Sequence, residues 1–168
     1  MILYLTGPSG AGKSSAGGLL AERAGRRFVD LDRLIEEYAG KSVTEVFNQD
    51  GERTFRALEK RALYDSSICA DAVVATGGGI VLDRSNRLFM RERGKVFLLV
   101  AAPKVLLERI AGTDNRPLLQ GCRKDTLIKT LFERAAAYCD ADGVLDTSAL
   151  SLSETVSCII ANSKFNAF

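Results

Sequence analysis

Histidine and tryptophan are absent from this chain of 168 residues, and proline occurs only three times. Without histidine, the chain can form neither a Ser-His or Cys-His nucleophile nor a zinc site of histidine and cysteine, so any proton transfer falls to other side chains. The cysteines are far apart and form no C-x-x-C pair, which predicts isolated reduced thiols. They are Cys69, Cys122, Cys139 and Cys158.

The chain also has almost no excess of either charge. Its 23 Lys and Arg residues are nearly balanced by 21 Asp and Glu residues, which gives a net charge of +2. No basic block is present, so neither nucleic acid nor a membrane surface is an expected partner. Apolar runs such as residues 96–102 fall far short of the roughly 20 residues that cross a bilayer. The N-terminus passes from an apolar run at Ile2 to a glycine-rich loop at Gly7, which leaves no room for a signal peptide and predicts a cytoplasmic protein.

What is present is a regular alternation of short apolar runs with helical patterns, and 46% of the residues are hydrophobic. This composition can bury one core, so residues 1–168 are predicted to form a single α/β domain. Residues 96–100 are apolar on both faces, which favours a central strand of a parallel sheet covered by helices on each side. The predicted strands are residues 2–5, 27–30, 72–75, 95–100 and 143–146.

Several helix starts are marked in the sequence. Ser42 and Ser151 are each followed three residues later by glutamate, which is the capping-box pattern, and Pro103 stands at a first helical position. Residues 111–124 contain two glycines and one proline between two helical patterns. We expect a long loop there, and loops of that length are usually functional or mobile.

Residues 7–14, GPSGAGKS, match the phosphate-loop pattern G-x-x-x-x-G-K-[ST] between the first predicted strand and a helical stretch. The glycines let backbone N–H groups converge on phosphate oxygens, Lys13 adds positive charge at the β- and γ-phosphates, and the Ser14 hydroxyl can bind Mg²⁺. The pattern therefore predicts nucleotide binding. It does not choose among kinases, ATPases, GTPases and switches.

Two carboxylates stand at the end of the second predicted strand. Asp30 and Asp32 are two residues apart, so on a strand they would share a face. One could hold the water shell of a metal while the other accepts a hydroxyl proton during phosphoryl transfer. The alternative is a pair of helix-capping or solvated aspartates.

A helical arginine and a run of glycines are further candidates. Glu59 lies three residues after Arg56, where it either forms a surface ion pair or fixes the guanidinium for bidentate binding of a carboxylate. Residues 77–79 are three glycines directly after the third predicted strand. They indicate either close approach by a ligand or another backbone, or a tight turn.

Two more arginines follow along the chain. Arg116 lies in the predicted long loop, where it could stack on a base or neutralise charge on a transferred phosphoryl group. Arg134 and Tyr138 are four residues apart on the following helix. For each arginine the alternative is a solvated surface position.

Taken in order, these segments resemble the shikimate kinase family across nearly the whole chain. That family combines a phosphate loop with F-x-D-x-D, G-E-x-x-F-R-x-x-E, G-G-G, R-P-L-L and R-x-x-x-Y segments and a final D-T. Such elements in one order are much more specific than a phosphate loop alone. In this chain they are residues 7–15, 28–32, 51–59, 77–79, 116–119, 134–138 and 146–147.

The resemblance implies Mg²⁺- and ATP-dependent transfer of the γ-phosphoryl group to the 3-hydroxyl of shikimate, in aromatic amino-acid biosynthesis. It implies that Lys13, Asp32 and Arg116 are catalytic, with Asp32 as the base, and that Ser14 and Asp30 hold Mg²⁺. It implies nucleotide contacts from Gly10, Ala11, Gly12, Lys13, Ser14, Ser15, Arg109 and Arg116. It implies shikimate contacts from Asp32, Phe47, Phe55, Arg56, Glu59, Gly77, Gly78, Gly79 and Arg134.

The resemblance also implies a three-layer P-loop kinase fold, in which helices cover both faces of a five-stranded parallel sheet in the order 2-3-1-4-5. A substrate-binding helical segment is expected at about residues 32–62, a mobile lid at about 111–124, and a monomer in solution. Two positions depart from the family pattern. Ala136 replaces a frequent proline, so the helix is expected to continue, and residues 148–151 lack the Arg or Asn often seen near adenine.

Other functions remain open at this point. A gluconate kinase-like enzyme would use the same loop and a carboxylate, although Arg56, Arg134 and the three glycines suit a rigid cyclic carboxylate better. A nucleoside monophosphate kinase would need a second phosphate cradle. A non-catalytic nucleotide-binding switch module could lose Lys13 or Asp32, and this sequence keeps both.

Overall fold

The computed structural model describes residues 1–68, 70–111 and 124–163. Within these ranges five parallel strands form one sheet in the order β2-β3-β1-β4-β5, which confirms the predicted topology. The predicted strand boundaries are correct to within one residue. The strands are β1 (Ile2–Thr6), β2 (Arg27–Asp30), β3 (Ala72–Ala75), β4 (Gly94–Val100) and β5 (Gly143–Asp146).

Helical elements connect these strands. Both predicted capping boxes are formed. The carboxylates of Glu45 and Glu154 accept hydrogen bonds from the backbone N–H groups of Ser42 and Ser151, and the backbone N–H groups of both glutamates donate to the hydroxyl oxygens of the same serines. The elements are α1 (Lys13–Arg23), α2 (Leu31–Ala39), α3 (Val43–Glu45), the π-helix η1 (Val46–Asp50), α4 (Gly51–Ser66), the 3₁₀-helix η2 (Ile80–Leu82), α5 (Arg84–Arg93), α6 (Pro103–Ala111), α7 (Lys124–Tyr138) and α8 (Leu152–Ser163).

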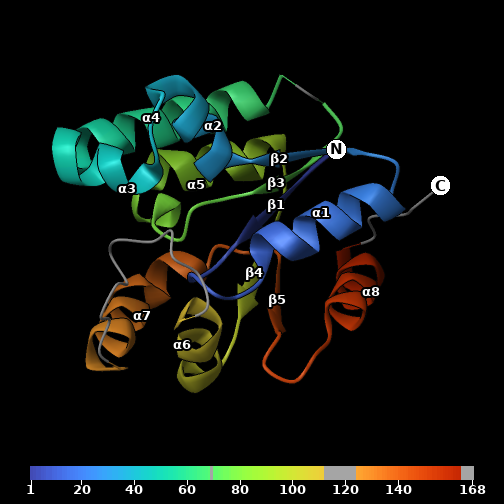
Figure 1. Ribbon diagram of the computed structural model, residues 1–168. Coiled ribbons are helices and arrows are strands. Elements are labelled where there is room, and N and C mark those ends of the chain that lie inside the picture. The colour runs from blue at the N-terminus through green and yellow to red at the C-terminus, as the bar shows by residue number, and fades with distance from the viewer. Residues whose placement is uncertain (69, 112–123, 164–168) are drawn as a thin grey trace.

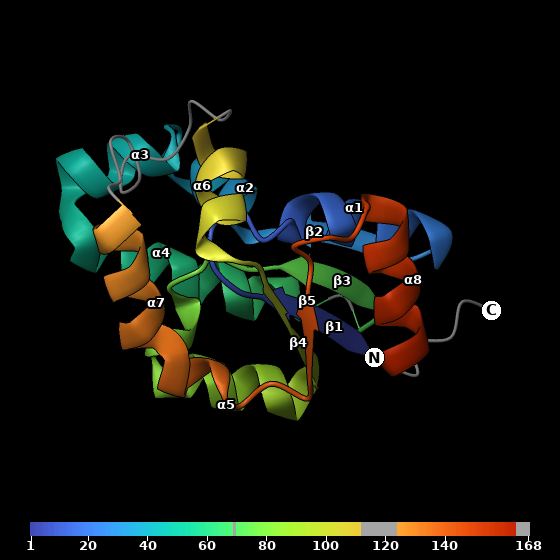
Figure 2. The same ribbon diagram turned by 90° about the horizontal axis from the view of Figure 1, so that it is seen from below.

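Helices cover both faces of the sheet and create two hydrophobic cores. Successive strand residues point to opposite faces, so Ile2 and Tyr4 of β1 enter one core while Leu3 and Leu5 enter the other. Helices α1 and α8 lie on one side and α5 on the other (Figures 1 and 2). This is the predicted three-layer arrangement, and it holds the strand ends rigidly.

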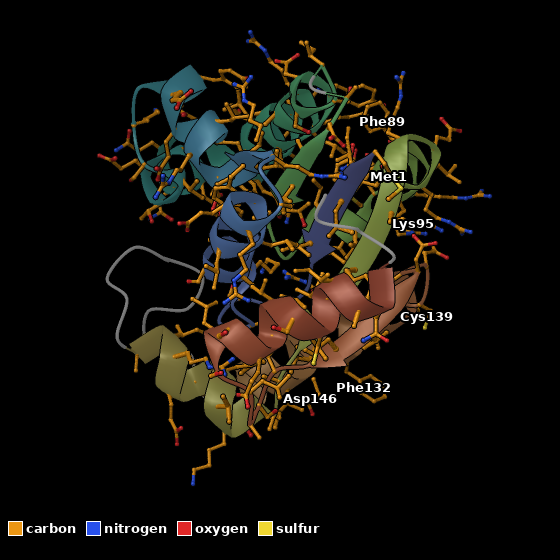
Figure 3. The ribbon with its side chains drawn as sticks, turned by 90° about the vertical axis from the view of Figure 1, so that its right-hand side faces the viewer. Met1, Phe89, Lys95, Phe132, Cys139 and Asp146 are labelled. Atoms are coloured by element: carbon orange, nitrogen blue, oxygen red, sulfur yellow. The ribbon has the colours of Figure 1, made fainter. Side chains whose placement is uncertain are left out.

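The helices α2, α3 and α4 lie together beyond the β2 edge of the sheet, and α6 and α7 lie together on the opposite side of the phosphate loop (Figure 1). Phe132 is exposed on α7, and the exposed residue Cys139 follows the end of this helix (Figure 3). Among the described cysteines, Cys139 and Cys158 are free thiols, whereas Cys69 and Cys122 fall outside the described residues. None of the described helices is long and apolar enough to cross a bilayer.

Candidate active site

The phosphate loop links β1 to α1 at the carboxyl end of the sheet. Gly10 and Gly12 have φ values of 82° and 92°, a backbone region that side chains other than glycine rarely enter. This conformation ends at the first turn of α1, where Lys13 is only 5% exposed. Its Nζ atom donates to the carbonyl oxygens of Gly7 at 2.8 Å and Pro8 at 2.9 Å. The ammonium group is thus held over the loop that would surround a phosphate chain.

A cavity of about 480 Å³ opens beside this loop. All six loop residues that were predicted to contact a nucleotide line it, together with Arg109 of α6. Residues that the sequence did not single out for this role also contribute, namely Ile110, Thr147, Leu150, Leu152 and Thr155. We name this space the nucleotide cavity. Its predicted lining residues are Gly10, Ala11, Gly12, Lys13, Ser14 and Ser15.

Arg109 connects the phosphate loop to the end of β5. Its guanidinium donates to the carbonyl oxygen of Gly10 at 3.3 Å and to the hydroxyl and carbonyl oxygens of Thr147 at 3.0 and 2.8 Å. The Thr147 hydroxyl in turn donates to Ala11 O at 3.2 Å. Arg116, the other arginine expected near the nucleotide, lies outside the described residues.

A second cavity of about 390 Å³ begins on the other side of Ser14, and we name it the acceptor cavity. Every residue predicted to contact shikimate or Mg²⁺ lines this cavity. They are Ser14, Asp30, Asp32, Phe47, Phe55, Arg56, Glu59, Gly77, Gly78, Gly79 and Arg134. Lining residues that the sequence did not single out are Pro8, Ser9, Arg33, Glu36, Val43, Leu127, Thr130 and Leu131.

The structure contradicts the predicted strand position of Asp32. β2 ends at Asp30, and Asp32 belongs to the first turn of α2. Asp30 is the N-cap of this helix, and its Oδ1 accepts a hydrogen bond from the backbone N–H of Asp32 at 3.0 Å. Because buried Leu31 begins the helix, the two carboxylates do not alternate as strand residues would. They still line the acceptor cavity together, and Asp30 also caps the helix.

Arg56 and Glu59 form an ion pair on α4 in which the carboxylate is buried and the guanidinium is partly exposed. Arg56 Nη1 lies 2.7 Å from Glu59 Oε2, and the Glu59 side chain is 2% exposed. The second oxygen, Oε1, is buried without a hydrogen-bond partner among the described residues. Burial raises the pKa of Glu59, the charge of Arg56 opposes this rise, and the charge of Asp32 adds to it.

Aromatic rings support this ion pair from one side. The rings of Phe47 and Phe55 meet edge to face with centroids 5.8 Å apart, and the Arg56 guanidinium lies 5.1 Å from the centre of the Phe55 ring. Such contacts limit the rotamers of a long side chain, so the Arg56 fork is held toward the cavity.

The three glycines after β3 make room for these charged groups. A Cβ atom at Gly77 would lie 2.7 Å from Glu59 Oε1, and one at Gly79 would lie 2.7 Å from Arg56 Nη1. A Cβ atom at Gly78 would lie 3.3 Å from Arg134 Nη1. The turn therefore needs glycine because the carboxylate and both guanidinium groups approach its backbone closely.

Helix α7 brings Arg134 to the same turn. It continues through Ala136 to Tyr138, as expected from the alanine at the position where proline is frequent. Arg134 is half-buried and lines the acceptor cavity, where it approaches the same glycine turn as Arg56. The two planar guanidinium groups can each bind a carboxylate oxygen pair, which a lysine could not do with the same geometry.

The described residues contain no group of three or more Asp, Glu, Cys or His side chains that could hold a metal alone. That finding suits Mg²⁺, which usually takes one or two protein oxygens and completes its shell with phosphate and water. The Ser14 hydroxyl and Asp30 carboxylate line one cavity at the phosphate loop and supply such oxygens.

A phosphate loop next to a charged acceptor cavity defines a P-loop kinase that acts on a small molecule. The shikimate kinase family model matches residues 9–163. A shikimate kinase from Gloeobacter violaceus is 45% identical over 164 residues, covering 95% of this chain and 92% of the relative. One from Geobacter sulfurreducens is 44% identical over 155 residues, covering 92% and 86%.

A solved structure shows the same arrangement of elements. Shikimate kinase from Acinetobacter baumannii, in complex with shikimate, superposes with a TM-score of 0.89 at 34% identity, covering 95% of this chain and 90% of that one. The chain belongs to the shikimate kinase family and is an ATP-dependent phosphotransferase.

Proposed function

We propose that the chain transfers the γ-phosphoryl group of ATP to the 3-hydroxyl of shikimate, giving shikimate 3-phosphate and ADP. The observation that carries this proposal is the junction of the two cavities at Ser14 on the phosphate loop. A nucleotide on one side and an acceptor on the other would meet at that point, as direct phosphoryl transfer requires. The acceptor cavity of about 390 Å³ suits a small ring better than a second nucleotide.

On the acceptor side, Asp32 is the proposed base. Its carboxylate lines the cavity from the first turn of α2, where it can orient a ring hydroxyl and accept the proton as the phosphoryl group is transferred. Arg56 and Arg134, which both lie beside the glycine turn, bind the carboxylate of shikimate. Phe47 and Phe55, whose rings contact each other, pack against the ring of shikimate. Together these contacts fix the acceptor hydroxyl for in-line attack.

On the nucleotide side, Lys13 and the backbone N–H groups of residues 10–15 bind the phosphates. The Lys13 charge and the N-terminal end of α1 stabilise negative charge on the β- and γ-phosphoryl oxygens. Arg109 contacts the nucleotide from α6 while holding Thr147 against the loop. A catalytic role for Arg116 stays a prediction.

Ser14 and Asp30 are the proposed Mg²⁺ ligands, with Asp30 acting through water. Bound Mg²⁺ would neutralise phosphate charge and fix the phosphoryl group in place. Both side chains line the acceptor cavity, which Ser14 also joins to the nucleotide cavity, and the Asp30 oxygen that caps α2 leaves its second oxygen for a water ligand.

A monomer in solution, acting as a single domain over residues 1–168, stays a prediction.

The test is ADP release by the purified protein with Mg²⁺ and ATP, comparing shikimate, gluconate and no acceptor. ADP release that depends on shikimate supports the proposal, whereas release with gluconate alone would overturn the acceptor assignment. ATP binding without acceptor-dependent release would favour a nucleotide-binding module. Lys13→Met serves as the control, because it removes the phosphate-binding charge while keeping a side chain of similar length.

A further inference from the structure

Tyr138 lies behind the glycine turn and is not among the residues that line the acceptor cavity. Its ring belongs to the hydrophobic core and is 7% exposed. Its hydroxyl donates to the carbonyl oxygen of Gly78 at 2.9 Å. The last turn of α7 is thereby joined to the turn after β3, sixty residues earlier in the chain.

This hydrogen bond fixes the orientation of one peptide plane. The Gly78 carbonyl and the Gly79 N–H belong to the same peptide, and none of the described peptides is cis. In a trans peptide these two groups point in opposite directions. Because Tyr138 binds the carbonyl from the core side, the N–H of Gly79 is turned toward the acceptor cavity, which Gly79 lines.

Arg134 also lies against the Gly78 peptide that Tyr138 holds, since a Cβ atom at Gly78 would be 3.3 Å from Arg134 Nη1. Burial raises the pKa of Tyr138, and the charge of Arg134 opposes that rise. The residues are four apart on α7, which places both side chains on one helix face.

We propose that Tyr138 is a positioning residue for the substrate carboxylate. Its hydroxyl sets the Arg134 guanidinium and the Gly79 N–H in one fixed arrangement, so that both donors meet the same anionic group. The hydroxyl itself does not touch the substrate. This inference rests on the proposed function, because it assigns to Tyr138 the orientation of the Arg134 clamp.

The test is Tyr138→Phe, which removes the hydroxyl and keeps the ring in the core. Loss of one ordering hydrogen bond predicts a KM for shikimate about threefold to tenfold higher, with kcat and the KM for ATP within about twofold of wild type. Tyr38→Phe is the matched control, because it removes a phenol that donates to Asp65 at 2.9 Å away from both cavities. The control should leave the KM for shikimate unchanged.

A double-mutant cycle that combines Tyr138→Phe with Arg134→Lys distinguishes the positioning role of Tyr138 from the binding of the substrate carboxylate by Arg134. If Tyr138 acts through Arg134, the double variant should have a KM for shikimate close to that of Arg134→Lys alone. Fully additive effects, or equal rises in both KM values for Tyr138→Phe, would overturn the positioning role while leaving the clamp in place. An unchanged KM for Arg134→Lys would overturn the clamp itself, and the role of Tyr138 with it.

Discussion

An alanine at position 79 should disturb the acceptor site without unfolding the protein. Gly79 has φ −100° and ψ −8°, a backbone conformation that alanine adopts freely. The added Cβ atom would lie 2.7 and 2.8 Å from Nη1 and Nη2 of Arg56. These atoms are the end of a flexible side chain, so we expect the guanidinium to move while the turn keeps its shape.

The expected rise in KM for shikimate follows from the hydrogen bonds to the substrate carboxylate that the displaced Arg56 guanidinium would lose. A hydrogen bond to a charged group contributes about 1.5–3 kcal/mol, and about 1.4 kcal/mol corresponds to a tenfold change in an equilibrium constant. If Arg56 no longer binds the substrate carboxylate, KM for shikimate should rise about 10-fold to about 150-fold. The KM for ATP should change by less than about twofold, because Arg56 does not line the nucleotide cavity.

The assay is steady-state ADP release at varied shikimate and at varied ATP, with thermal unfolding of the same samples. Gly18→Ala in α1 is the matched control, since its Cβ would meet only ring atoms of Phe28 at 4.0 Å. It should keep both KM values and gain up to about 1 kcal/mol of stability from the higher helix propensity of alanine. A folded Gly79→Ala enzyme with a wild-type KM for shikimate would refute the assigned role of Arg56.

Three further changes test separate parts of the site. Lys13→Met should lower kcat by several orders of magnitude with the fold retained, and turnover near the wild-type rate would contradict the phosphate-loop assignment. Arg109→Ala should raise the KM for ATP more than that for shikimate, which the same two titrations measure. Glu59 has a pKa raised by burial, so its contribution to the free energy of unfolding falls as pH rises from the ordinary glutamate value toward the folded one. Glu59→Gln should therefore flatten the pH dependence of stability in urea unfolding above the ordinary glutamate pKa, and an unchanged profile would argue against a buried, titrating Glu59.

Local sequence patterns predicted the sheet well because each strand is short, apolar and bounded by clear signals. Residues 27–30, 72–75 and 143–146 are strands with the predicted boundaries. The phosphate loop was also predictable, since its function depends on glycines and a lysine that are adjacent in sequence.

Features that depend on contacts between distant parts of the chain were harder to predict from the sequence. The alternation of strand residues favoured a strand position for Asp32, but Asp30 caps α2, which is the helix-capping alternative that the sequence had left open. The spacing of Arg56 and Glu59 left a surface pair and a substrate clamp equally open, and only the packing of α4 against the glycine turn buries Glu59. The hydrogen bonds of Thr147 with Arg109 and of Tyr138 with Gly78 join residues 38 and 60 positions apart, so no local spacing indicates them.

The most direct test of the account is to identify the product. The purified protein would be incubated with Mg²⁺, ATP and shikimate, and phosphorus and proton NMR would locate the phosphate while ADP is counted in parallel. We predict one phosphorylated acceptor for each ADP, with the phosphate on the 3-hydroxyl. ADP without a phosphorylated acceptor, or phosphate on another hydroxyl, would contradict the assigned geometry of Asp32, Arg56 and Arg134.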